Sequence, residues 1–121
     1  VTTLAGAAGE PDFVDGPASI ARFRAPTGVA VDGIGNIYVA DQGNSAVRKL
    51  TPSGETTTLT GAEYSEWADG IGSDAFFSYP KGVAVDVAGN VYVADTDNSI
   101  IRKVTPSGHV TTIAGKAKEW D

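Results

Sequence analysis

The chain is built from two copies of one unit, offset by a constant 54 residues. Residues 28–45 read GVAVDGIGNIYVADQGNS, and residues 82–99 read GVAVDVAGNVYVADTDNS. Laying residues 13–61 over residues 67–115 gives 28 identities in 49 positions. A fixed period of this length is typical of stacked supersecondary units, because such a unit buries its apolar face only against a neighbour.

Two units are few for a stacked architecture, in which about three or more are expected for stability. We therefore expect the 121 residues to be either a piece of a longer protein or a chain completed by further copies of itself.

Composition excludes several classes of protein. With 41% hydrophobic and 20% charged residues the chain is of the globular type. It has no cysteine, which excludes disulfides and thiolate metal sites. A net charge of -6 argues against a phosphate-binding surface, so nucleic acid is not an expected partner. No apolar stretch approaches the roughly 20 residues of a membrane span, so no membrane insertion is expected.

Each unit carries four short strand signals. Runs such as Val29-Ala30-Val31 are apolar on consecutive residues, which predicts strands covered on both faces. The predicted strands are residues 28–32, 36–41, 46–50 and 56–60 in the first unit and residues 82–86, 90–95, 100–104 and 110–114 in the second.

The segments between these strands have hairpin length and turn chemistry. Residues 32–36 and 86–90 place a glycine where a positive φ is needed, and residues 51–54 and 105–108 combine proline with glycine. Helical spacing appears nowhere over a useful length. The prediction is an all-β chain of two four-stranded antiparallel sheets, covered on both faces and repeated in sequence, as in the blades of a β-propeller.

These residues also carry a family resemblance. The pattern of proline, one residue, Gly-Val-Ala-Val-Asp, a Gly-Asn turn, Tyr-Val-Ala-Asp, Asn-Ser and an Arg-Lys strand resembles the NHL repeat, and it covers nearly the whole chain twice. The resemblance implies a propeller, commonly six-bladed, with the strands at Gly28 and Gly82 innermost and the Thr-Thr strands outermost. The leading loops, residues 7–27 and 62–81, are longer than the family's usual repeat.

We divide the chain into an extra outer strand at residues 1–6, a first blade with its leading loop at 7–61, a second at 62–115 and a tail at 116–121. Residues 1–6 repeat the outer-strand pattern, so three outer strands serve two blades. In a longer propeller the surplus strand finishes the preceding blade. In a ring of separate chains it competes with the neighbour's Val110 strand for one edge.

Two blades do not close a ring by themselves. We expect copies to associate head to tail, with three chains giving six blades, and regard an open filament as the less favoured variant.

Two sets of carboxylates are weak candidates for a metal site. Asp41 and Asp95, with Asp97 beside the latter, stand in the second hairpin turn, where oxygen ligands suit calcium. Asp32 and Asp86 end the innermost strands, where converging carboxylates would resemble the metal site of six-bladed lactonase-type hydrolases. The favoured interpretation of both sets is structural: the side chains cap turn amides, and Arg48 or Arg102 pairs with a carboxylate. We expect no catalytic residue and no cofactor, calcium being the one ion that these carboxylates would suit.

The leading loops and second hairpin turns are expected to share one face of a propeller, here called the loop face. It collects twelve acids against five bases, which favours a cationic partner or divalent ions, although polar loops alone explain it. The acids are Glu10, Asp12, Asp15, Asp41, Glu63, Glu66, Asp69, Asp74, Asp95, Asp97, Glu119 and Asp121, and the bases are Arg22, Arg24, Lys81, Lys116 and Lys118.

Aromatic residues accompany these acids and are candidates for anchoring a protein or glycan ligand. The favoured alternative is that each seals its loop onto the blade. The candidate ligand residues on this face are Phe13, Tyr64, Trp67, Asp69, Tyr79 and Trp120.

We interpret the chain as a non-catalytic scaffold or binding module. Three alternatives remain open: a fragment of a six-bladed metal-dependent hydrolase or lyase, a glycan-binding propeller, and a purely structural assembly or filament. The zinc lyases on related propellers need several histidines, whereas His109 is the single one here. The compartment is left open, with a lean toward export from the cysteine-free acidic composition and the family's frequent extracellular use.

Overall fold

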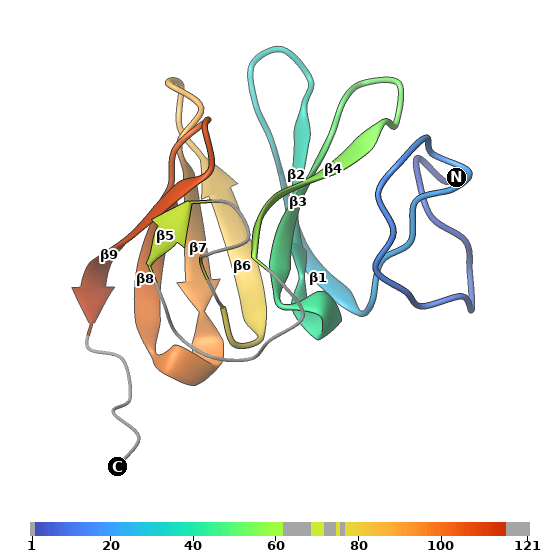
Figure 1. Cartoon of the computed structure of the whole chain (residues 1–121). Coiled ribbons are helices and arrows are strands. Elements are labelled where there is room, and N and C mark those ends of the chain that lie inside the picture. The colour runs from blue at the N-terminus through green and yellow to red at the C-terminus, as the bar shows by residue number, and fades with distance from the viewer. Residues whose placement is uncertain (1, 62–68, 72–74, 76, 116–121) are drawn as a thin grey trace.

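The computed structural model describes residues 2–61, 69–71, 75 and 77–115. It contains two antiparallel sheets that stand face to face, each built on a meander of four consecutive strands (Figure 1). The first sheet has the order β1-β2-β3-β4, and the second has the order β5-β9-β8-β7-β6. Among these residues no helix has the length and hydrophobicity to cross a membrane.

The elements recur with the sequence repeat. In the first blade they are β1 (Pro26–Val31), β2 (Ile37–Asp41), the 3₁₀ turn η1 (Gln42–Asn44), β3 (Ala46–Leu50) and β4 (Thr56–Gly61). In the second they are β5 (Gly70–Ile71), β6 (Pro80–Val85), β7 (Val91–Asp95), the 3₁₀ turn η3 (Thr96–Asn98), β8 (Ile100–Val104) and β9 (His109–Gly115).

The eight predicted strands are all present, with ends that differ by no more than two residues. The predicted turn chemistry is also present, since Gly35 and Gly89 adopt φ of 93° and 86° in the first hairpin of each blade. Strand β5, which the sequence did not predict, pairs with β9 as a fifth strand over two residues. Its counterpart in the first blade is a single bridge between Gly16 and Thr56.

Residues 2–6, where an extra outer strand was expected, form no strand in the structure. A strand there needs the exposed edge of a preceding blade, and the described residues offer none. The segment instead lies beside the first blade, where the Gly6 N–H donates to the Ala18 carbonyl at 3.0 Å. Val1 lies outside the described residues.

The hydrophobic core lies between the two blades. The first blade contributes Tyr38 and Val47, with the partly buried Leu59 packed against them. The second blade contributes the opposite wall, made by Ala75, Phe77, Val83, Val85, Val91, Val93, Val104 and Val110. The second blade therefore presents one face, and the first blade the reverse face, to a shared apolar interior.

The two outer sides of the pair are uncovered. On the first blade Val29 and Val31 are 65% and 60% exposed, although their counterparts Val83 and Val85 pack in the core. On the second blade Ile101 and Ile113 are 40% and 51% exposed. Burying an aliphatic side chain is worth about 1.5–3 kcal/mol, so both faces lack the contact that their sequence is suited to make.

The inner strands β1 and β6 meet closely between the blades. Thr27 Oγ1 donates to the carbonyls of Pro80 and Lys81 at 3.3 and 3.1 Å. A Cβ on Gly28 would lie 2.5 Å from the Lys81 carbonyl oxygen, whereas a Cβ on the equivalent Gly82 would meet nothing nearer than the Ala94 Cβ at 3.9 Å. Gly28 is therefore required by the approach of a neighbouring blade.

We predict that Gly28→Ala destabilises the chain by about 1–3 kcal/mol, because the methyl group forces the blades apart. The matched change Gly82→Ala is expected to stay within about 0.5 kcal/mol in the dilute chain. Urea unfolding followed by circular dichroism measures both. Equal effects at the two positions would contradict the packing described for Gly28.

Candidate functional site

The loop face of the first blade is organised by one fully buried arginine. Arg48 Nη1 donates to Asp41 Oδ2 at 2.6 Å, and its Nη2 donates to Asp15 Oδ1 at 2.8 Å. The same two nitrogens also donate to the carbonyls of Arg22 and Val14, each at 2.8 Å. Arg48 thus joins strand β3, the end of β2 and two points of the leading loop.

Two phenylalanine rings enclose this guanidinium. Its carbon lies 4.9 Å from the centroid of Phe13 and 4.8 Å from that of Phe23, within the range of cation–π attraction. The Arg48 Nε is buried and has no hydrogen-bond partner among the residues that the structure describes. The positive charge of Arg48 is therefore stabilised by two carboxylates and by the faces of two aromatic rings.

The second blade repeats the arrangement with the same offset. Arg102 pairs with Asp95 at 2.8 Å and with Asp69 at 3.0 Å, and its guanidinium carbon lies 4.8 Å from the Phe77 ring centroid. We call each set an arginine clamp: Asp15, Asp41 and Arg48 in the first blade, and Asp69, Asp95 and Arg102 in the second.

Asp41 and Asp95 also bind the backbone just before the inner strand of their blade. Asp41 Oδ1 accepts from the Arg24 N–H at 2.8 Å, and Asp95 Oδ1 accepts from the Ser78 N–H at 2.7 Å. The remaining oxygens accept from Asn44 and Asn98 as well as from the arginines. Both oxygens of these two metal candidates are therefore engaged within the protein.

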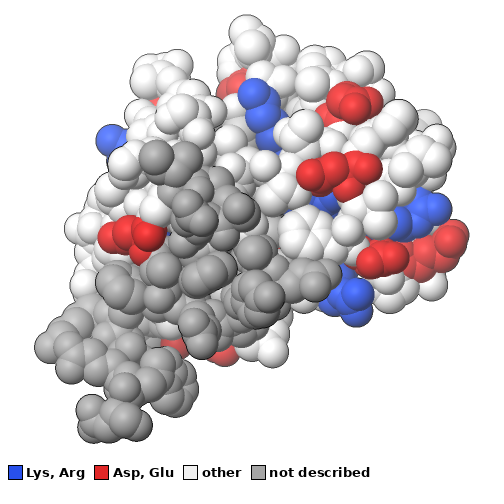
Figure 2. All heavy atoms as spheres, viewed as in Figure 1, with Lys and Arg blue, Asp and Glu red and all other residues white. Residues whose placement is uncertain are grey.

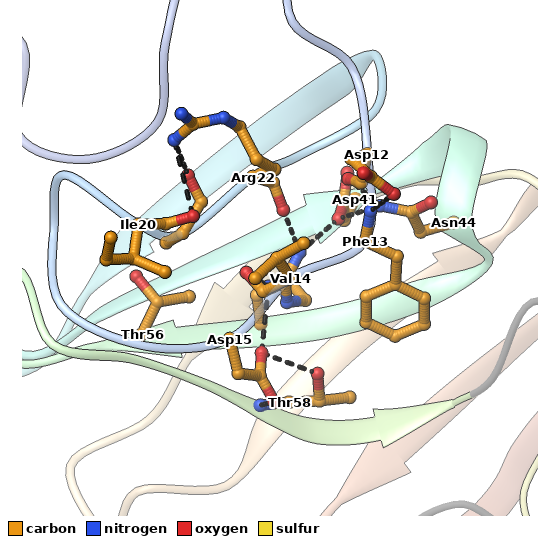
Figure 3. Close-up of polar contacts among 12 residues, drawn as sticks. Asp12, Phe13, Val14, Asp15, Ile20, Arg22, Asp41, Asn44, Thr56 and Thr58 are labelled. Atoms are coloured by element: carbon orange, nitrogen blue, oxygen red, sulfur yellow. Dashed lines mark hydrogen bonds and ion pairs between the residues drawn. The ribbon is translucent and has the colours of Figure 1, made fainter.

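Asp15 and Asp69 fasten the outer strand to the loop, and Figure 3 shows the contact of Asp15 with Thr58 in the first blade. Asp15 accepts from the Thr58 N–H at 3.1 Å and from its hydroxyl at 2.9 Å. Asp69 accepts from the Thr112 hydroxyl at 3.0 Å. Their side chains are 45% and 41% exposed, in contrast to the buried Asp41 and Asp95.

Asp32 and Asp86, the other metal candidates, organise the first hairpin turns. Asp32 Oδ1 accepts from the N–H groups of Ile34 and Asn36, and its Oδ2 accepts from the Asn36 amide and the Tyr38 hydroxyl. Asp86 makes the same four contacts with Ala88, Asn90 and Tyr92. Each carboxylate holds one turn closed and fixes the tyrosine of the next strand.

These contacts change the acidity of the paired groups. Burial by itself raises the pKa of Asp32, but the hydrogen bonds from Asn36, Ile34 and Tyr38 outweigh it and lower the pKa below 3.8. Hydrogen bonds from Asn90 lower the pKa of Asp86 in the same way. Burial and the carboxylate raise the pKa of Tyr38 above 10.0, and the hydrogen bond to Asp86 raises that of Tyr92.

The structure places the other candidates differently. Asp97 is exposed on η3, and its N–H donates to the Ser78 carbonyl at 3.1 Å. Phe13 stacks on Arg48, whereas Tyr79 is 43% exposed with φ of 52°. The candidates Tyr64, Trp67 and Trp120 lie outside the described residues. In the part of the chain that the structure describes, no three acids or histidines gather as a metal site.

The net negative charge of the loop face is smaller than the charge counted from the sequence. Among its described residues are seven of the acids and three of the counted bases, to which the clamps add Arg48 and Arg102. The described part therefore sums to -2 instead of the -4 that the same residues gave without the clamps. Figure 2 likewise shows acidic and basic atoms interspersed over the described surface in view.

Sequence reasoning anticipated that the arginines pair with carboxylates but missed the role of Asp15. The available signal was its exact recurrence as Asp69, together with Phe23 and Phe77, at the constant offset that also relates Arg48 to Arg102. Side chains that recur as a set, on strand and loop together, indicate that they meet in space.

Strand order, meander connection and face-to-face packing define the blades of a β-propeller. Two solved propeller structures agree. A protein of unknown function from Bacteroides thetaiotaomicron is 31% identical with a TM-score of 0.77, covering 83% of this chain and 26% of its own. An auxiliary nutrient binding protein from Bacteroides ovatus is 26% identical with a TM-score of 0.70, covering 92% of this chain and 28% of its own.

The family follows from the repeated motif. The NHL repeat model matches residues 23–50 and 77–103, which hold the three inner strands of each blade. NHL repeat-containing protein 2 of Gallus gallus is 37% identical over 92 residues, 74% of this chain. The chain belongs to the NHL-repeat proteins. It spans only 9% to 12% of the length of the curated relatives it matches.

We predict that Arg48→Met destabilises the fold by about 3–5 kcal/mol, because it leaves the Asp41 carboxylate buried without a cation. Asp15→Asn should cost about 1 kcal/mol or less, since that carboxylate is half exposed. The double change of Arg48→Met with Asp41→Asn is expected to recover part of the loss. Urea unfolding measures the free energy of unfolding of all three variants. Equal losses of stability for Arg48→Met and Asp15→Asn would contradict the role given to the arginine clamp.

A second prediction concerns pH. The folded chain holds the pKa of Asp86 below its ordinary value of 3.8. The ionised Asp86 carboxylate therefore stabilises the fold fully at pH values above 3.8, and this stabilisation is lost as the pH falls through the lowered pKa. Tyr92→Phe removes one donor and raises that pKa toward 3.8. The urea midpoints of wild type and variant should therefore differ most at neutral pH and converge in acid. Tyr79→Phe is the matched control, and a difference that grows in acid would contradict this assignment.

Proposed function

We propose that this chain is a non-catalytic propeller scaffold: two rigid blades that contribute to a ring and present their loops to a binding partner. The proposal rests on what the four candidate metal-binding carboxylates do in the structure. Asp32, Asp41, Asp86 and Asp95 each accept at least three hydrogen bonds from their own blade. Side chains engaged in this way serve to hold turns and loops in place.

The arginine clamps support a scaffold role in a second way. Each clamp joins the second hairpin turn, the leading loop and the outer strand of one blade, so the loop is fixed by buried contacts. A binding surface held by buried contacts binds with less loss of conformational freedom. The leading loop of the first blade, which these contacts hold from Asp12 onward, is where a partner, protein or glycan, would be recognised.

One solved relative supports a binding role by analogy only, because one fold hosts many functions. The Bacteroides ovatus protein is named an auxiliary nutrient binding protein, and the match with this chain covers 28% of its length. A ring built on these blades therefore needs further blades, supplied by other copies or by further sequence.

The test is calcium binding, which separates the scaffold from a metal-dependent hydrolase. We expect calcium chloride or EDTA to leave the thermal unfolding midpoint unchanged, since the candidate oxygens are engaged by protein donors. A site saturated at a hundredfold excess over Kd would add about 2.7 kcal/mol of stability. A calcium-dependent rise that Asp32→Asn and Asp86→Asn abolish, but Glu55→Gln does not, would overturn the proposal, since Glu55 is an exposed acid outside the metal candidates.

A further inference from the structure

Each uncovered side of the blade pair repeats a side that is covered inside it. Val29 and Val31 stand at the positions of Val83 and Val85, which pack in the core between the blades. Ile101 and Ile113 stand at the positions of Val47 and Leu59, which form the other wall of that core. The chain thus carries both halves of one interface, one half free at each end.

The free side of the first blade has a preformed hollow. It measures about 310 Å³ and is lined by Leu4, Phe23, Val29, Ile37, Val39 and Leu50, among others. The equivalents of Phe23, Val39 and Leu50 are Phe77, Val93 and Val104, which belong to the core cluster against which Leu59 packs. The hollow therefore has the shape and chemistry that receive an aliphatic side chain from an outer strand.

Leu4 shows what this hollow accepts. It belongs to the Thr2-Thr3-Leu4 segment, which repeats the Thr57-Thr58-Leu59 and Thr111-Thr112-Ile113 segments of the outer strands. Leu4 lines the hollow while remaining 56% exposed, and Val29 is left open beside it. The N-terminal segment therefore covers the site incompletely, and Ile113 is the side chain of the same type that is free elsewhere.

The polar contacts of the inner strands are also repeated. Inside the chain, Gly28 and Thr27 approach the Lys81 carbonyl. At the free end, Gly82 occupies the position of Gly28 and has open space where a neighbouring carbonyl would lie. A glycine there leaves room for the close approach of another inner strand.

We propose that a second copy of this chain docks head to tail on the first blade and reproduces the internal interface. Ile101 and Ile113 of one copy pack on Val29 and on the hollow beside it in the next, and Ile113 takes the place of Leu4. This inference rests on the proposed scaffold function and names the partner that completes it. The interface joins two different faces, so it continues from copy to copy until three chains close a ring of six blades.

The experiment uses two variants that each block one face. Val29→Asp places a charge on the receiving face, and Ile113→Asp places one on the docking face, both at side chains exposed in the single chain. Light scattering after size exclusion should give about three chains for wild type and one chain for each variant. A mixture of the two variants retains one intact pair of faces and should give a mass of two chains.

Matched variants separate docking from damage to the fold. Val87→Asp changes an apolar side chain exposed in a turn and should keep the wild-type mass. Gly82→Ala should fold as wild type by circular dichroism yet lose association, because its methyl group meets the inner strand of the next copy. A wild-type chain that stays monomeric, or variants that do not pair on mixing, would overturn this inference. The scaffold proposal is tested separately by calcium, so the two failures are distinguishable.

Discussion

The buried pair of Arg48 with Asp41, repeated as Arg102 with Asp95, is the contact on which each blade depends. It joins adjacent strands, and through a further carboxylate and two loop carbonyls in the first blade it fixes a segment without regular structure. A buried ion pair gains little net stability but costs several kcal/mol when one partner is removed. Its value here is specificity, since the observed path of the first blade's loop supplies acceptors for both Nη atoms of Arg48.

A second constraint comes from geometry. A four-stranded blade has two apolar faces, and two stacked blades cover only the pair between them. Every further blade removes one open face and creates another, so only closure into a ring covers them all. The uncovered valines and isoleucines of this chain follow from that rule and do not indicate a poorly packed fold.

The sequence predicted the strands well because the repeat, the turn glycines and the β-branched runs are all local signals. It also identified Asp41, Asp95, Asp32 and Asp86 as turn residues, and the structure gives each a defined set of donors. The role of Asp15 was not predicted because it depends on a contact with Thr58, 43 residues away. The charge of the loop face was overestimated for the same reason, since the clamp arginines come from strands that were counted separately.

The contact between Asp15 of the leading loop and Thr58 of the outer strand affects how such chains diversify. In the first blade the loop is held from Asp12 onward, by the Phe23 carbonyl, Asn44, Arg48 and Thr58. Residues 2–11, upstream of that point, form no strand, and surface segments of this kind tolerate changes of length. The first blade thus combines a fixed frame with a segment that tolerates insertions, so changes in that segment need no redesign of the frame.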